Sequence, residues 1–74
     1  MKSLSITSLE IQLGWLKTLK NPVNKEQHEF DIKFFKYILN SDDCEQKARD
    51  YINTIYRYRC LNKEIADKLG WKID

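Results

Sequence analysis

The sequence predicts an all-α protein, a compact small bundle of three main helices plus a short C-terminal helix, with residues 1–74 as a single helical domain. A chain of 74 residues is near the lower limit at which one hydrophobic core stabilises a fold. Its 42% hydrophobic and 32% charged residues are typical of a globular chain. Two Gly and one Pro leave little material for turns, which favours helices joined by short loops over a β fold.

The first helix is predicted to start at Thr7, because Thr7 and Glu10 have the spacing of a capping box and Ile6 and Ile11 flank it as a hydrophobic staple. Asn21–Pro22 is a stop signal, so the helix should end at about residue 20. Its apolar residues form two adjacent stripes, Leu9, Leu13 and Leu16 in one and Ile11, Trp15 and Leu19 in the other. Together these stripes are wider than a surface helix normally shows.

The second helix is predicted to follow Asn24, an N-cap with Gln27 three residues later, and to end near Asn40. It is apolar on two nearly opposite sides, with Phe30, Phe34, Tyr37 and Ile38 on one and His28, Ile32, Phe35 and Leu39 on the other. Such a helix must be central to its domain or bury one side in a partner. Three helices of this size can hardly surround it. We therefore predict a protein interface formed by His28, Ile32, Phe35 and Leu39.

The third helix is predicted to start at Asp42, where Glu45 repeats the capping pattern, and to continue to about Leu61. Cys44 and Cys60 would then lie on one helix, about 24 Å apart. A disulfide needs Cα atoms within about 7 Å, so both thiols are expected to be reduced.

A short fourth helix is predicted over residues 63–69, with Asn62 as its N-cap. Gly70 stands where a left-handed residue closes a helix, and Trp71 follows it. These residues account for the last part of the predicted bundle.

Several classes of function are disfavoured by what the sequence contains. The only histidine, His28, lies on an apolar stripe, and Asp42, Asp43 and Glu45 are explained by helix capping. Two distant cysteines make no zinc site, and no Gly-rich phosphate loop or nucleophile elbow is present. We expect no enzyme, no cofactor, no metal and no small-molecule substrate.

The composition also predicts where the protein is found. No apolar run is long enough to span a bilayer, and the start of the chain lacks the apolar core of a signal peptide, which predicts a cytoplasmic protein without membrane contact. Lys outnumbers Arg ten to three, a bias typical of AT-rich coding sequence. A low-GC bacterium or its phage is the predicted source.

Residues 62–74, NKEIADKLGWKID, resemble the first helix and turn of the helix-turn-helix family. Ala66 is small where two helices would approach closely, Ile65 and Leu69 would face the core, and Gly70 stands at the turn. In that family a second helix enters the major groove and reads the bases. The sequence stops at Asp74, before such a helix, so the resemblance implies an incomplete motif. An amphipathic helical turn closed by Gly70 explains the same residues without nucleic acid.

Two functions remain open at this point. The leading hypothesis is a small, phage-encoded regulatory or inhibitory protein that binds another protein or itself, as in a homodimer, because its aromatic and apolar content exceeds what so small a core can bury. The alternative is a transcription-regulator-like, nucleic-acid-binding protein. Its predicted phosphate contacts are Arg57, Arg59, Lys63, Lys68 and Lys72.

Overall fold

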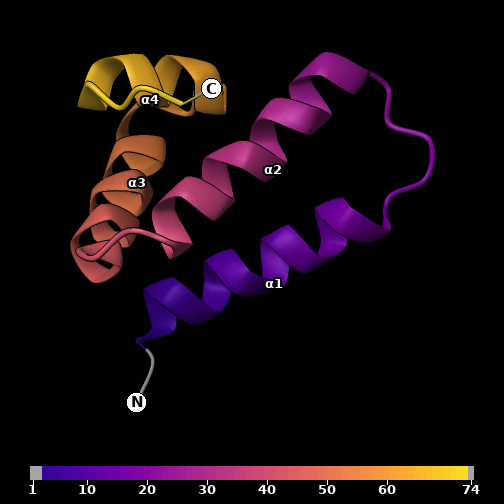
Figure 1. The fold of residues 1–74 in the computed structure, drawn as a ribbon. Helices are drawn as coiled ribbons and strands as arrows, with labels where there is room; N and C mark the ends of the chain where they lie inside the picture. The colour runs from indigo at the N-terminus through magenta and orange to yellow at the C-terminus, as the bar shows by residue number, and fades with distance from the viewer. Residues whose placement is uncertain (1–2, 74) are drawn as a thin grey trace.

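The computed structural model describes residues 3–73, which form four α-helices. They are α1 (Leu4–Thr18), α2 (Lys25–Leu39), α3 (Cys44–Tyr58) and α4 (Asn62–Leu69), as drawn in Figure 1. The described part of the chain contains no strand, so the predicted small all-α bundle with a short C-terminal helix is confirmed. None of the helices within residues 3–73 is both long and apolar enough to cross a membrane.

α1 begins earlier than the sequence predicted, and the predicted capping box does not form. The hydroxyl oxygen of Ser3 accepts a hydrogen bond from the backbone N–H of Ile6 at 3.2 Å, so Ser3 is the N-cap and Thr7 lies inside the helix. Ser is the somewhat better N-cap, whereas Glu10 at capping-box spacing favours Thr7, so the local signals compete. The earlier start makes Ile6 part of a helix that buries it in the core, which stabilises the fold by about 1.5–3 kcal/mol.

The start of α2 agrees with its sequence signal. The side-chain oxygen of Asn24 accepts a hydrogen bond from the backbone N–H of Gln27 at 3.0 Å, and Asn40 closes the helix. Both predicted ends of this helix are confirmed.

α3 is shorter than predicted. Its N-cap is Asp43, which makes no capping hydrogen bond through its side chain, and the helix ends at Tyr58 because Arg59 adopts a left-handed conformation with φ of 49°. That conformation costs about 1–2 kcal/mol. It reverses the chain so that α4 can bury Ile65 completely, a gain of similar size. Cys60 therefore lies beyond α3, not on it, although both cysteines are free as predicted.

α4 is closed by the predicted glycine. Gly70 has a φ of 75°, its N–H donates to the carbonyl of Asp67 at 3.2 Å, and the N–H of Trp71 donates to the carbonyl of Ala66 at 2.9 Å. This pair of bonds defines a Schellman motif. Asn62 is the first residue of the helix, not its cap, because its side chain bonds to Asp31 of α2 instead.

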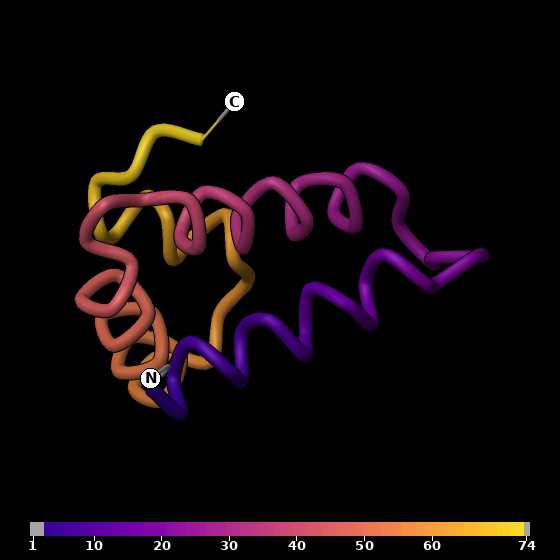
Figure 2. Tube along the Cα trace, turned by 60° about the horizontal axis from the view of Figure 1, so that its bottom comes forward, coloured from indigo at the N-terminus to yellow at the C-terminus, as the bar shows by residue number. Residues whose placement is uncertain are grey.

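The core is built around α2, which contacts α1, α3 and α4. Its largest buried ring, Phe34, lies 5.3 Å from the ring of Tyr51 on α3 and 5.7 Å from that of Trp71 after α4. Figures 1 and 2 show α1 beside α2 at the edge of the molecule, with the connection between them projecting away from α3 and α4. α1 contacts α2 and α3 but not α4.

Candidate functional site

One residue of the predicted interface on α2, Phe35, lies in the core of the protein. Phe35 is 3% exposed and packs edge-on against Phe34 and Tyr51, with ring centres 5.6 Å and 5.5 Å apart. It therefore belongs to the internal core and is not free to meet a partner. His28, Ile32 and Leu39 are each partly buried, and an interface role for these three stays a prediction.

The expectation that so few helices cannot surround α2 was wrong, because α4 and the residue that follows Gly70 also pack on α2. α4 packs on α2, and the residue after Gly70 folds back so that the ring of Trp71 lies 5.8 Å from the ring of Tyr37. α1 and α3 cover the remaining sides. A helix with two apolar sides is thus central here, the first of the two arrangements that its pattern allows.

Four of the eight large apolar residues that are exposed in the described chain belong to α1 or to its C-cap. Leu4 is 90% exposed and Trp15 75%, and Ile11 and Leu19 are each about half exposed. At 100° per residue Leu4, Ile11 and Trp15 project opposite the buried residues Ile6, Leu9 and Leu13, and Leu19 follows as the C-cap of the helix. We use the name outward face of α1 for Leu4, Thr7, Ser8, Ile11, Gly14, Trp15, Thr18 and Leu19.

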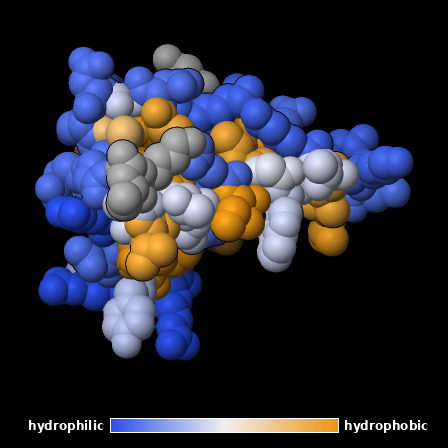
Figure 3. Space-filling view, turned by 90° about the horizontal axis from the view of Figure 1, so that it is seen from below, coloured by the Kyte–Doolittle hydropathy of each residue, from blue (hydrophilic) through white to orange (hydrophobic). Residues whose placement is uncertain are grey.

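The outward face of α1 carries no charged residue. Glu10 and Lys17 are the only charged residues within α1, and the helical repeat places both on one flank. In the view from below, orange and pale surface recurs along this side of the molecule (Figure 3). The Ile11, Trp15 and Leu19 stripe was the sequence signal for this surface, but the sequence could not tell that α1 would be peripheral.

The five basic residues predicted for nucleic-acid contact are all exposed, but they do not line one surface hollow. Arg57 and Lys68 line a hollow between α3 and α4, where the Lys68 ammonium lies 4.5 Å from the centre of the Tyr58 ring. Lys63 and Lys72 line another hollow together with Asp67. Arg59 belongs to the connection before α4 and lines neither hollow. Residues 71–73, which follow the Gly70 turn, contain no helix.

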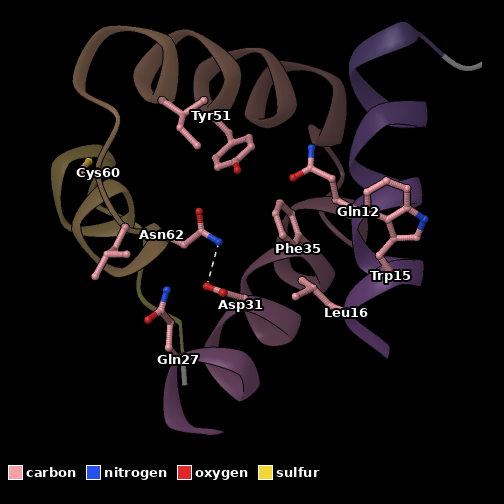
Figure 4. Close-up of a pocket in the computed structure, with 11 residues that line it drawn as sticks. Gln12, Trp15, Leu16, Gln27, Asp31, Phe35, Tyr51, Cys60 and Asn62 are labelled. Atoms are coloured by element: carbon pink, nitrogen blue, oxygen red, sulfur yellow. Dashed lines mark hydrogen bonds between the residues drawn. The ribbon is translucent and has the colours of Figure 1, made fainter. Parts of the chain in front are cut away.

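A groove of about 340 Å³ lies behind the outward face of α1, between α1, α2, α3 and the start of α4 (Figure 4). Asp31 projects into it from α2, and the side-chain N–H of Asn62 donates to Oδ1 of Asp31 at 2.9 Å. Burial raises the pKa of Asp31 above its ordinary 3.8, although the hydrogen bond from Asn62 and the nearby His28 act in the opposite direction. No feature of the sequence indicated this contact between residues 31 positions apart.

Tyr51 forms another side of the groove. Its side chain is 3% exposed, and desolvation by burial, with a smaller effect from the charge of Asp31, raises its pKa to about 12. The phenol therefore stays protonated at neutral pH. Figure 4 shows its hydroxyl directed into the groove, on the same side as the amide of Gln12.

The described residues hold no group of three or more His, Cys, Asp or Glu side chains that could bind a metal ion. Two ion pairs, Lys47–Asp43 at 2.7 Å and Arg49–Glu45 at 3.2 Å, lie on the surface of α3 at i, i+4 spacing. Pairs of this kind contribute little to stability and mark no site.

No family model matches this chain, and comparison with curated proteins and with solved structures gave no match either. Two surface features of the chain itself bear on its function, namely the outward face of α1 and the groove next to it.

Proposed function

We propose that this is a small regulatory or inhibitory protein that acts by protein–protein contact, and that the outward face of α1 is its contact surface. One observation carries the proposal: four large apolar side chains are exposed along a helix face that has no charge. Monomeric proteins rarely leave a continuous apolar patch of this kind in water. Trp15, the largest of the four, has the character of an interface anchor.

The occupant that we propose for this face is a second copy of the chain, in an antiparallel α1–α1 pair. With a twofold axis at Ile11, Trp15 lies opposite Thr7, Leu4 opposite Thr18 and Gly14 opposite Ser8. Ile11 then faces its own copy at the axis, whereas Trp15 and Leu4 each face a threonine, which is the self-complementarity that a twofold interface requires. Nothing lies within 4 Å of where a Cβ of Gly14 would stand, so the two helix backbones can approach closely there.

The size of the surface is sufficient for such a pair. A stable interface buries at least about 1,200 Å² in total, or about 600 Å² from each copy. That is roughly a tenth of the 5707 Å² surface of the chain. α1 is about 22 Å long, and Trp15 alone contributes on the order of 150 Å².

Sedimentation equilibrium tests the proposal. Protein concentrations of roughly 5–500 µM span the dissociation constants of dimers of moderate affinity. We expect the wild-type chain to dimerise and Ile11→Arg to weaken the dimer by about 100-fold or more, because two arginines would meet at the twofold axis. Tyr56→Arg is the matched control: Tyr56 is more exposed than Ile11 but lies on α3. A wild-type chain that is monomeric throughout, or a dimer that Ile11→Arg leaves intact, would overturn the assignment.

A further inference from the structure

The groove behind α1 contains polar groups that the fold does not use. Within residues 3–73 the hydroxyl of Tyr51 makes no hydrogen bond to any protein atom, although the residue is only 3% exposed. No side-chain nitrogen or oxygen in the described chain is both fully buried and without a partner. The Tyr51 hydroxyl therefore opens into the groove, as Figure 4 shows, and its hydrogen-bonding capacity is available to a ligand.

Asp31 is the second such group. Only its Oδ1 accepts a hydrogen bond from the protein, and no described Lys or Arg forms an ion pair with it. It is also the only residue lining the groove that carries a charge at neutral pH. A partly buried carboxylate that no Lys or Arg pairs with is unfavourable for folding, so it is a group that a cation would stabilise.

The other polar side chains of the groove include the amides of Gln12, Gln27 and Asn62, each of which offers both donors and an acceptor oxygen. A carboxylate can only accept, so the Asn62 N–H must face Asp31 and its carbonyl oxygen is left over. Gln12 uses its N–H to donate to the Ser8 hydroxyl at 3.3 Å, which leaves its carbonyl oxygen as well. A positively charged ligand with N–H donors therefore complements Asp31 and the free amide oxygens.

Aromatic side chains form the walls of the same groove. Trp15 and Leu16 from α1 and Phe35 from α2 lie together on one side of the groove, across from Asp31 and Asn62 (Figure 4). Indole and phenyl faces attract a delocalised cation, and a planar guanidinium both stacks on such faces and pairs with a carboxylate. An ammonium ion pairs with the carboxylate but does not stack on the aromatic faces.

We propose that this groove is a binding site for a guanidinium or amidinium group carried on a flat or apolar body, with Asp31 as its counter-ion and Tyr51 as a hydrogen-bonding partner. The volume of about 340 Å³ is at the lower end of the range for small-molecule sites. The same chemistry is presented by a small organic cation and by an arginine side chain of another polypeptide. The site overlaps the proposed dimer contact only at Trp15, because Asp31 and Tyr51 do not belong to the outward face of α1.

The test is a titration of the ¹⁵N-labelled chain, followed by NMR at the Trp15 indole N–H and the Asn62 side-chain amide. Benzamidine is expected to give saturable shifts with a Kd on the order of 1 mM. Benzamide, which has the same shape without the charge, should bind at least tenfold more weakly. Acetyl-Phe-Arg-amide is the second arm: tighter binding than benzamidine identifies an arginine side chain as the natural occupant, and weaker binding identifies a small cation.

Variants connect the shifts to the named groups. Asp31→Asn keeps the hydrogen bond from Asn62 and should lower benzamidine affinity at least tenfold, and Tyr51→Phe should lower it severalfold. Asp67→Asn, an exposed carboxylate on α4 outside the groove, is the matched control and should change nothing. Measured in the Ile11→Arg background, where the dimer is weakened, the same variants separate a failure of this site from a failure of the dimer. No saturable shift, equal binding of benzamide, or full affinity in Asp31→Asn would overturn the site.

Discussion

α1 and α2 have the same unusual sequence property and opposite fates. Both carry two stripes of large apolar side chains, adjacent on α1 and nearly opposite on α2. α2 lies between the other three helices and buries Phe34, Phe35 and Ile38, whereas α1 lies at the edge and leaves Leu4 and Trp15 exposed. Apolar residues on two sides of a helix therefore indicate a partner only when the helix is peripheral. The other elements of the fold, not the pattern itself, decide which helix that is.

The largest expected effect is on α2. Phe35→Asp should unfold the chain, because it places an unpaired charge among the rings of Phe34 and Tyr51, at a cost of about 4 kcal/mol or more. That is most of the stability of a domain this small. Circular dichroism should show loss of helix. Retention of native helicity in a soluble Phe35→Asp protein would contradict the core position of this residue.

A pair of truncations compares the two helices directly. Phe34→Ala should lower the free energy of unfolding by about 3–5 kcal/mol, because it leaves a cavity at the centre of the core. Trp15→Ala removes a larger side chain but should lower it by less than about 1 kcal/mol in the monomer, since Trp15 is mostly exposed. Urea unfolding of both variants at low concentration measures the difference. Equal losses would mean that α1 is as central to stability as α2.

Substitution of Gly14 separates the stability of the monomer from the affinity of the dimer. Gly14→Ala should raise the stability of the monomer by up to about 1 kcal/mol, because alanine favours the helix and its methyl group meets nothing within the chain. The same methyl group should weaken the proposed α1–α1 contact. For this one variant we therefore expect a higher midpoint of thermal unfolding and a weaker dimer in sedimentation. A variant that gains stability and dimerises as tightly as the wild type would argue against close helix approach at this position.

Asp31 gives a pH dependence whose sign follows from its raised pKa. Its folded pKa lies above the ordinary 3.8, so the ionised form disfavours folding, and this destabilisation appears as the pH rises through the folded value. Asp31→Asn should therefore be more stable than the wild type at pH 7 by no more than about 1 kcal/mol, since Asp31 is only partly buried. The advantage should disappear near pH 3. A variant that is less stable at pH 7 would show that the carboxylate serves the fold.

The smallest expected effect concerns nucleic acid. The exposed basic residues line separate hollows, and Glu64 and Asp67 are also exposed on α4. We expect weak, salt-sensitive and sequence-independent binding to duplex DNA at most. Fluorescence anisotropy with labelled duplexes at physiological salt measures it. Submicromolar affinity that distinguishes between sequences would favour the helix-turn-helix alternative over the protein-binding proposal.

The sequence alone determined the features that depend on bonds between near neighbours. The Asn24 cap joins residues three apart, and the Gly70 turn closes a helix through bonds within five residues, so both were predictable. Where two nearby residues can both cap a helix, the sequence was insufficient. Ser3 and Thr7 are both candidate N-caps of α1, and the start at Ser3 is the one that buries Ile6 in the core. The end of α3 at Arg59 was likewise set by where α4 packs.

Only the tertiary structure decided which surfaces are available for function. Whether Phe35 or Trp15 is exposed depends on which helix the others surround, and burial is a sum over contacts between elements that no local pattern encodes. The groove has the same origin, because Asp31 and Asn62 meet only after α4 has folded back onto α2. Helix periodicity reports which side chains share a face, but packing between helices decides which face remains in water.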